Sequence, residues 1–109
     1  MEKLLVVTRS DLPPGARCAQ ACHTLRAFVA AHPGLDREWF EGSNNLVVLE
    51  VADEPALEGL ARRAGVSGVP LATFREPDFG DALTGVALAG AGARLVSSLP
   101  LALRPARAA

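Results

Sequence analysis

The sequence has few cysteines and no pattern of metal ligands. Cys18 and Cys22 are the two cysteines among 109 residues. In a helix their Cβ atoms would lie roughly 5–6 Å apart on one face. A disulfide prefers about 3.8 Å between Cβ atoms, so we expect two reduced thiols in a reducing compartment. A structural metal needs two more ligands at suitable spacing, and because the sequence offers none, no metal is expected.

Long hydrophobic runs are also missing. The apolar stretch at residues 4–7 is far too short for a membrane span or for the core of a signal peptide. Half of the residues are hydrophobic and 21% are charged, which is enough for a packed core. The length is that of one domain. We therefore predict a single soluble, cytoplasmic domain over residues 1–103, with a disordered tail at 104–109 and no membrane contact.

Positive charge is not in excess. Eleven basic residues face twelve acidic ones, and the net charge is −1. Because affinity for nucleic acid depends largely on Lys and Arg side chains that neutralise phosphates, this balance disfavours a general polyanion binder. An uneven distribution could offset it, since Arg9, Arg17, Arg26 and Arg75 all lie near the polar residues considered below.

Apolar periodicity, turn residues and capping residues divide the chain into alternating elements. Strands are predicted at 3–8, 46–51, 69–74 and 83–89, and helical segments at 16–31, 35–40, 54–64 and 92–99. Asp53 is a suitable N-cap for the third helical segment. This order predicts an α/β fold, a three-layer domain with a four-stranded mixed sheet and helices on both faces. In such sheets sites form beyond the carboxyl ends of strands, here the loop at 11–15.

The first predicted helix has two distinct faces. Its apolar residues form a stripe centred near Leu25, and the stripe comprises Cys18, Ala21, Cys22, Leu25, Phe28 and Val29. Gln20 and His23 fall on the opposite side, one turn apart. His23 is therefore predicted to lie outside the core. Two interpretations remain, an ordinary surface histidine or a general base that accepts a proton from water near neutral pH.

Other polar residues have both an ordinary and a functional interpretation. Arg9 and Asp11, at the end of the first strand, could form a solvated ion pair or part of a site. Glu76, Asp78 and Asp81 could be turn carboxylates, and Thr84, which opens the last predicted strand, is common in strands for its β-propensity. The sequence contains no glycine-rich phosphate loop, nucleophile elbow or metal motif.

Three segments together resemble a known family. The first is Arg9-x-Asp11-Leu12 followed by a short loop to Gly15-x-x-x-Ala19-Gln20-x-x-His23. The second is Trp39, Ser43 and Asn44 before a strand, and the third is Phe74-Arg75-Glu76-Pro77-Asp78 leading to Leu83-Thr84-Gly85-Val86-Ala87-Leu88. These segments are similar to those of the archaeal/eukaryotic-type peptidyl-tRNA hydrolases in a bacterial variant, and they span nearly the whole chain.

The resemblance implies hydrolysis of the ester that joins a nascent peptide to the terminal ribose of tRNA, without a cofactor. It implies His23 as the base, with Asp11 or Asp78 orienting the histidine or the water. Substrate-binding residues would be Arg9, Arg17, Gln20, Asn44, Arg75, Glu76 and Thr84, the three arginines forming a basic patch for the tRNA end. Peptidyl-tRNA and a second copy of the chain, as a homodimer, are the implied partners.

The sequence departs from the family pattern at two places. Family members commonly have lysine directly after the loop glycine, where this chain has Ala16, and the segment at 76–78 replaces the family's Asp-Ala-Gly-Arg-Thr-Gln stretch. These departures favour an alternative function, a non-catalytic RNA-binding or regulatory homologue on the same fold.

Overall fold

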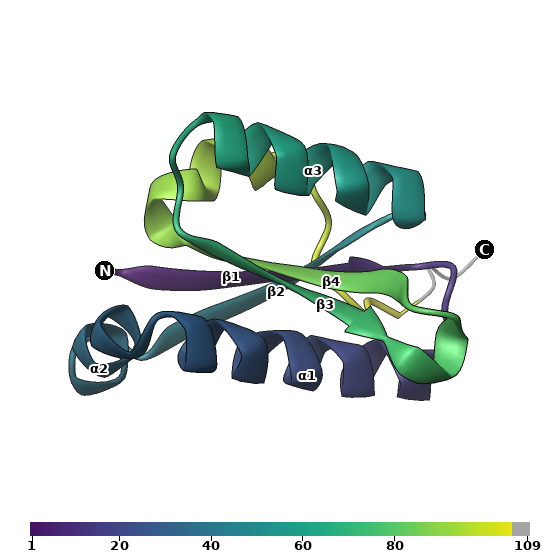
Figure 1. The fold of residues 1–109 in the computed structure, drawn as a ribbon, viewed down its shortest axis with the longest axis horizontal. Coiled ribbons are helices and arrows are strands. Elements are labelled where there is room, and N and C mark those ends of the chain that lie inside the picture. Colours follow the sequence, from purple (N-terminus) through teal and green to yellow (C-terminus); the bar gives the residue numbers. More distant parts are fainter. Residues whose placement is uncertain (106–109) are drawn as a thin grey trace.

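The computed structural model describes residues 1–105 and contains one mixed β-sheet. Its strands are β1 (Lys3–Arg9), β2 (Asn45–Val51), β3 (Leu71–Glu76) and β4 (Ala82–Ala89), in the order β2-β1-β4-β3 (Figure 1). β1 is parallel to β2, whereas β4 is antiparallel to both β1 and β3. The predicted four-stranded mixed sheet is confirmed.

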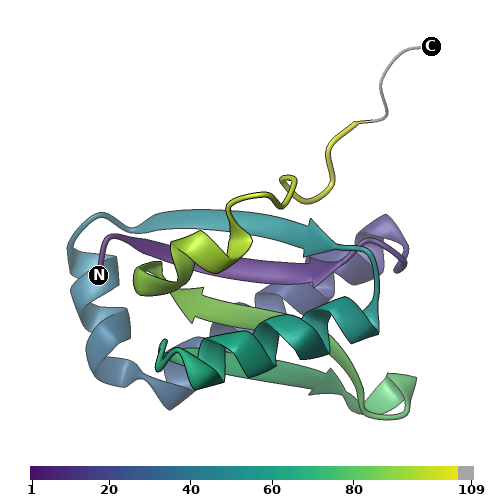
Figure 2. The same ribbon diagram turned by 90° about the horizontal axis from the view of Figure 1, so that it is seen from above.

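Helices cover both faces of this sheet, as predicted. Helix α1 (Pro14–Ala31) and the shorter α2 (Pro33–Glu41) lie on one face. Helix α3 (Glu54–Val66) and the 3-10 helix η2 (Gly90–Val96) lie on the other face, as Figures 1 and 2 show. A short 3-10 turn, η1 (Pro77–Phe79), connects β3 to β4.

Strand β1 is buried on both sides, which explains its uninterrupted apolar sequence. Leu4 and Val6 pack toward α1 and α2 with Phe28. Leu5 and Val7 pack toward α3 in a second cluster. Because each face of the strand has its own apolar layer, the alternation that marks a half-exposed strand is absent.

Several element boundaries differ from the prediction. Helix α1 begins at Pro14 rather than at Ala16, since proline is tolerated in the first helical turn. Strand β3 begins and ends two residues later than predicted, and the last predicted helix, 92–99, is the 3-10 helix at 90–96. The predicted N-cap is confirmed, because the Asp53 side chain accepts a hydrogen bond of 3.1 Å from the Ala56 N–H.

The buried face of α1 matches the predicted apolar stripe only in part, since Phe28 is buried and Ala21 and Leu25 pack against the core. The helix buries Gln20, Thr24 and Phe28, while Cys18 and Cys22 are exposed, free thiols. The predicted placement of Gln20 on the outer, polar side is wrong. The reason is that α1 packs its N-terminal half on a polar part of the sheet, so apolarity does not mark the buried side there.

Gly85 fixes how closely α1 approaches β4. A Cβ atom at Gly85 would lie 1.8 Å from Thr24 Oγ1 and 2.8 Å from Thr24 Cβ. No real Cβ contact is that short, so the glycine is required for the helix to lie at this distance from the strand.

The C-terminal segment covers part of the open edge of β2. The Glu50 N–H donates to the Pro100 carbonyl at 3.1 Å, and the Ala102 N–H donates to the Val48 carbonyl at 2.9 Å. Arg104 and Pro105, which begin the predicted disordered tail, are exposed and outside regular secondary structure, and residues 106–109 of that tail lie outside the described residues.

Gly85→Ala is predicted to lower the free energy of unfolding by about 1–3 kcal/mol, the usual range for overpacking, because α1 must move off the sheet. Urea denaturation followed by circular dichroism measures this. The matched control is Gly65→Ala in α3, where a new Cβ meets nothing within 4 Å. It should leave stability unchanged or raise it slightly. Equal effects of the two substitutions would contradict the close-packing argument.

Candidate active site

A connected chain of buried polar side chains lies between α1 and the sheet. Four polar residues are buried among those described, namely Thr8, Gln20, Thr24 and Thr84. The Thr84 hydroxyl donates to Gln20 Oε1 at 2.6 Å, and Gln20 Nε2 donates to Glu76 Oε1 at 3.0 Å. Thr24 Oγ1 donates to the Gln20 carbonyl at 2.7 Å, and Thr8 Oγ1 donates to the Thr84 carbonyl at 3.1 Å. Both polar ends of the Gln20 amide are therefore held in place.

A β-bulge directs Thr84 into this network. Phe74 pairs with Gly85 and Arg75 pairs with Leu83, so Thr84 has no partner residue on β3. The extra residue changes which way the side chains point. Leu83 and Val86 both join the apolar layer under α3, while Thr84 and Gly85, between them, face α1.

His23 lies beside the network, at the line where α1 meets β3. Its ring stacks on Phe74 with a centroid separation of 4.8 Å and an interplanar angle of 14°. Gln20 precedes His23 by one helical turn, and Glu76 follows Phe74 by two residues on the same strand face. The two contacts, His23 with Phe74 and Gln20 with Glu76, are thus neighbours. His23 is exposed, so solvent can reach its ring.

The structure brings Glu76 to this site but not the two predicted aspartates. Asp78 is exposed on η1, and Asp11 is bound by Arg9 at the end of β1. Among the described residues no hydrogen bond joins either aspartate to His23. The carboxylate nearest in the network is therefore that of Glu76, which had been predicted as a substrate-binding residue.

Arg9 and Asp11 form a compact ion pair at the carboxyl end of β1. Arg9 Nε and Nη2 donate to the two Asp11 carboxylate oxygens, each at 2.9 Å, and Arg9 Nη1 donates to the Leu83 carbonyl at 3.1 Å. The hydrogen bonds from Arg9 are the main cause that lowers the pKa of Asp11 below its ordinary value. The same bonds, against the opposing effect of burial, raise the pKa of Arg9. This pair anchors the loop before α1.

The predicted basic patch of Arg9, Arg17 and Arg75 is not assembled. Arg17 donates to the Leu12 carbonyl at 2.8 Å and to Glu50 at 3.1 Å, on the β2 side of α1. Arg75 donates to Glu58 of α3 at 2.9 Å, on the opposite face of the sheet from His23. Each of the three arginines is paired with a carboxylate, so their charges are locally neutralised.

Asn44 lies away from the other predicted residues. It precedes β2, whose first residue pairs with Lys3 at the start of β1, whereas Arg9 and Asp11 are at the other end of β1. Asn44 adopts a positive φ of 51°, and its N–H donates to the Trp39 carbonyl at 2.8 Å. In this structure its place is therefore that of a turn residue.

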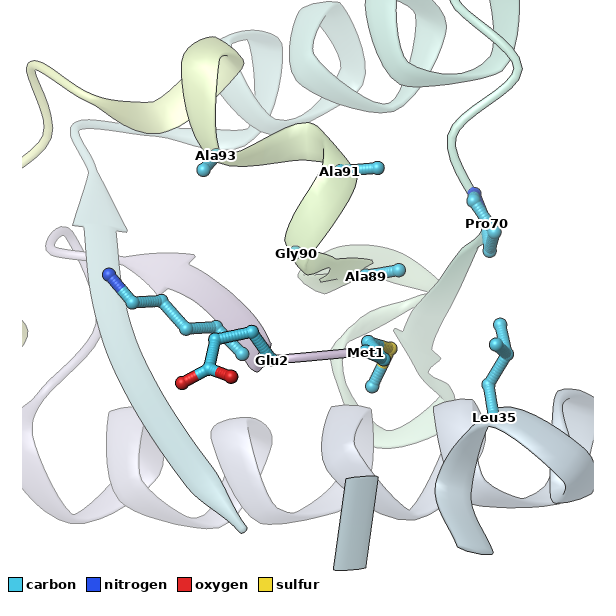
Figure 3. Close-up of a pocket in the computed structure, with 9 residues that line it drawn as sticks. Met1, Glu2, Leu35, Pro70, Ala89, Gly90, Ala91 and Ala93 are labelled. Carbon is cyan, nitrogen blue, oxygen red and sulfur yellow. The ribbon is translucent and has the colours of Figure 1, made fainter. Parts of the chain in front are cut away.

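An apolar cavity in the structure is also remote from His23. It has a volume of about 530 Å³ and lies near the start of β1 and the end of β4, as Figure 3 shows. Its lining is mostly apolar and includes Met1, Leu35, Pro70 and Ala89. Because no group of convergent polar side chains faces it, it lacks the chemistry of a hydrolytic site.

Thr8, Thr24, Phe74 and Gly85 contribute to the site but were not singled out from the sequence as site residues. Thr8 and Thr24 complete the buried hydrogen bonds, and Phe74 supports the His23 ring. One sequence signal was available, since Phe74 is separated from Glu76 by a single residue and strand alternation places both on one face. The role of Gly85 depends on the close helix contact, which no local pattern reveals.

Comparison with known proteins identifies the family. Residues 2–96 match the family described as peptidyl-tRNA hydrolase PTH2, and the chain belongs to that family. Among solved structures, a protein of unknown function from Agrobacterium tumefaciens strain C58 has the same fold, with a TM-score of 0.64 and 16% identity over 91% of this chain and 96% of the other. No curated protein matches significantly.

The described residues, 1–105, contain neither a membrane-spanning helix nor a cluster of metal ligands. No helix there is long and apolar enough to cross a membrane. The same residues contain no group of three or more His, Cys, Asp or Glu side chains that could hold a metal ion.

Thr84→Val is predicted to destabilise the fold by about 1–3 kcal/mol, because it leaves the buried Gln20 Oε1 without its donor. Thr84→Ser, which keeps the hydroxyl, should retain most of the stability. Thr73→Val is the matched control, since Thr73 is exposed on β3 and should change stability by less than about 0.5 kcal/mol. Thermal or urea unfolding distinguishes them, and a loss in Thr84→Ser equal to that in Thr84→Val would contradict the hydrogen-bond argument.

Asp11→Asn tests the ion pair through its pH dependence. The folded pKa of Asp11 lies below its ordinary value of 3.8, so the pair stabilises the fold above that value and loses its effect as the pH falls through the folded pKa. The Asp11 side chain is 40% exposed, so the contribution should be less than about 1 kcal/mol. The unfolding free energies of wild type and variant should differ at pH 7 and converge in acid. A constant difference would contradict this assignment.

Proposed function

We propose that the chain hydrolyses the ester bond of peptidyl-tRNA at the site formed by His23, Gln20, Glu76 and Thr84. The observation that carries the proposal is the hydrogen-bonded Gln20 amide, fixed by Thr84 and Glu76 beside an exposed histidine. Membership of the PTH2 family supports the reaction class and the substrate.

In the proposed reaction, His23 accepts a proton from a water molecule, and the resulting hydroxide attacks the ester carbonyl carbon. The bond from that carbon to the ribose oxygen then breaks, and the protonated His23 returns the proton to the ribose oxygen. The products are a peptide carboxylic acid and a tRNA with a free terminal hydroxyl. Stacking on Phe74 restricts the orientation of the His23 ring, and the Glu76 carboxylate favours the transient positive charge on it.

Gln20 has a distinct part in this proposal. One of its two amide hydrogens is committed to Glu76, and its oxygen accepts from Thr84. In this proposal the buried amide does not touch the substrate but holds the Glu76 carboxylate in place beside His23. Because Thr84 fixes which end of the amide faces Glu76, the carboxylate is positioned before substrate binds.

The lysine that family members commonly carry after the loop glycine has no substitute nearby. Ala16 occupies that position, and the neighbouring Arg17 points toward Leu12 and Glu50. In this proposal the chemistry depends on His23, Gln20 and Glu76 without a cation from the helix N-terminus. The activity is expected in the cytoplasm, where peptidyl-tRNA is produced, and a homodimer is expected from the family.

Turnover of an N-acetylaminoacyl-tRNA by the purified chain tests the proposal. His23→Ala should lower kcat/KM by roughly 10²–10⁴-fold, the usual contribution of a general base. Glu76→Gln keeps the hydrogen bond acceptor but removes the charge, and it should lower kcat more than it raises KM.

Asp78→Asn and Asp11→Asn are the discriminating variants. Glu76 rather than either aspartate contacts the network, so both should retain activity within about threefold of wild type. If Asp78→Asn loses more activity than Glu76→Gln, Asp78 rather than Glu76 assists His23, as predicted from the sequence. The proposal is excluded if the wild-type protein releases peptide no faster than the uncatalysed reaction and His23→Ala gives the same rate. The chain would then be the non-catalytic homologue.

A further inference from the structure

Three arginines that take no part in the candidate site lie on two neighbouring elements of the other face of the sheet. Arg62 and Arg63 are in the last two turns of α3, and Arg94 is on η2. All three are exposed, and none forms an ion pair with a carboxylate of residues 1–105. Figure 2 shows α3 and η2 next to each other on this face. We call Arg62, Arg63 and Arg94 the arginine surface.

Two of these guanidinium groups converge on one point. Arg63 Nη1 lies 3.3 Å and Arg62 Nη2 lies 4.0 Å from the position that a Cβ would occupy at Gly59. Two like charges held so close repel each other, and the repulsion is relieved when an anion binds between them. Glycine is also unfavourable in the interior of a helix, but its missing side chain leaves open space at this point.

A shallow hollow adjoins the paired guanidinium groups. It has a volume of about 330 Å³ and is lined by Arg62, Arg63, Val66, Ser67 and Leu95. Val66 is 86% exposed, which is unusual for an aliphatic side chain beside two charges. The hollow is thus lined by both apolar and cationic side chains. A nucleotide matches both, because its base is flat and apolar on its faces and its phosphate is anionic.

Negative charge is scarce around the arginine surface. The sequence has no Asp or Glu between Glu58 and Glu76, and none after Asp81. Glu58 precedes Arg62 by one turn, but its carboxylate accepts from Arg75 at 2.9 Å. Glu54, at the start of α3, accepts from the Leu83 N–H at 2.5 Å. The carboxylates of α3 are therefore engaged elsewhere, and the charge of the arginine surface is not compensated.

We infer that the arginine surface binds the phosphate backbone of RNA. The inference rests on the proposed function for the identity of the polyanion, which is then the body of the tRNA whose terminal ester reaches His23. The principal extents of the protein are 41 × 33 × 24 Å, and a folded tRNA is longer than the largest of them. A tRNA that contacts both faces of the sheet passes around an edge of the protein.

Binding of fluorescent uncharged tRNA at several salt concentrations tests the inference. Arg62→Gln/Arg63→Gln should raise Kd about tenfold at 100 mM salt and reduce the slope of log Kd against log salt by about 1.5–2, since two phosphate contacts are lost. Arg94→Gln alone should reduce the slope by about 1. The matched control, Arg37→Gln/Arg104→Gln, has the same net charge and should change Kd by less than about twofold.

A small substrate separates this inference from the proposed function. The double variant should hydrolyse a peptidyl ester of adenosine at the wild-type rate but show a raised KM for peptidyl-tRNA. If the double variant and the control bind tRNA equally well, the inference is overturned even where wild-type turnover is intact. Weakened binding to anionic phospholipid vesicles with unchanged tRNA affinity would also overturn it, in favour of a membrane surface. If the wild-type chain shows no turnover but the double variant loses tRNA binding, the result supports RNA binding by the arginine surface and rejects the proposed hydrolysis.

Discussion

The close contact between α1 and β4 determines most of what this small domain can do. Thr24 lies against Gly85, where a Cβ atom has no room, and this contact sets the distance at which Gln20 meets Thr84 and Glu76. A helix held further away would leave buried amide and hydroxyl groups without partners, which is costly in a low-dielectric interior. The apolar layers on both sides of β1 supply the stability that allows these polar residues to be buried between α1 and the sheet.

The fold was largely predictable because its signals are local. The apolar run of β1, the Asp53 cap and the alternation of strands and helices each depend on neighbouring residues, and together they predict the mixed sheet. The strand order and the exact limits of β3 depend on pairing between distant segments. The buried side of α1 was mispredicted in part, for a related reason. A helix that packs on threonine and glycine buries glutamine and threonine, so Cys18 and Cys22 of the apolar stripe are exposed, whereas its Phe28 is buried.

The site was predictable only where a motif fixed the spacing. His23 and Gln20 are one turn apart by helical geometry, and the family resemblance singled out both. The identity of the neighbouring carboxylate was not accessible in that way, since Glu76 and Asp78 differ by two residues and only the end of β3 decides which one faces α1. The arginines were misplaced because a sequence does not show which charges are already paired. Arg9, Arg17 and Arg75 have carboxylate partners, whereas Arg62, Arg63 and Arg94 have none among the described residues.

The bulge at Thr84 links the chemistry of this protein to its hydrophobic core. Residues 83 and 86 serve one apolar layer while 84 and 85 serve the opposite face, an arrangement that a regular strand, with strict alternation, cannot produce. Deletion of a single residue here would restore regular pairing and at the same time move either the threonine or a leucine to the wrong side. Individual side chains in β4 can therefore be exchanged, whereas a change in its length displaces residues of either the site or the core.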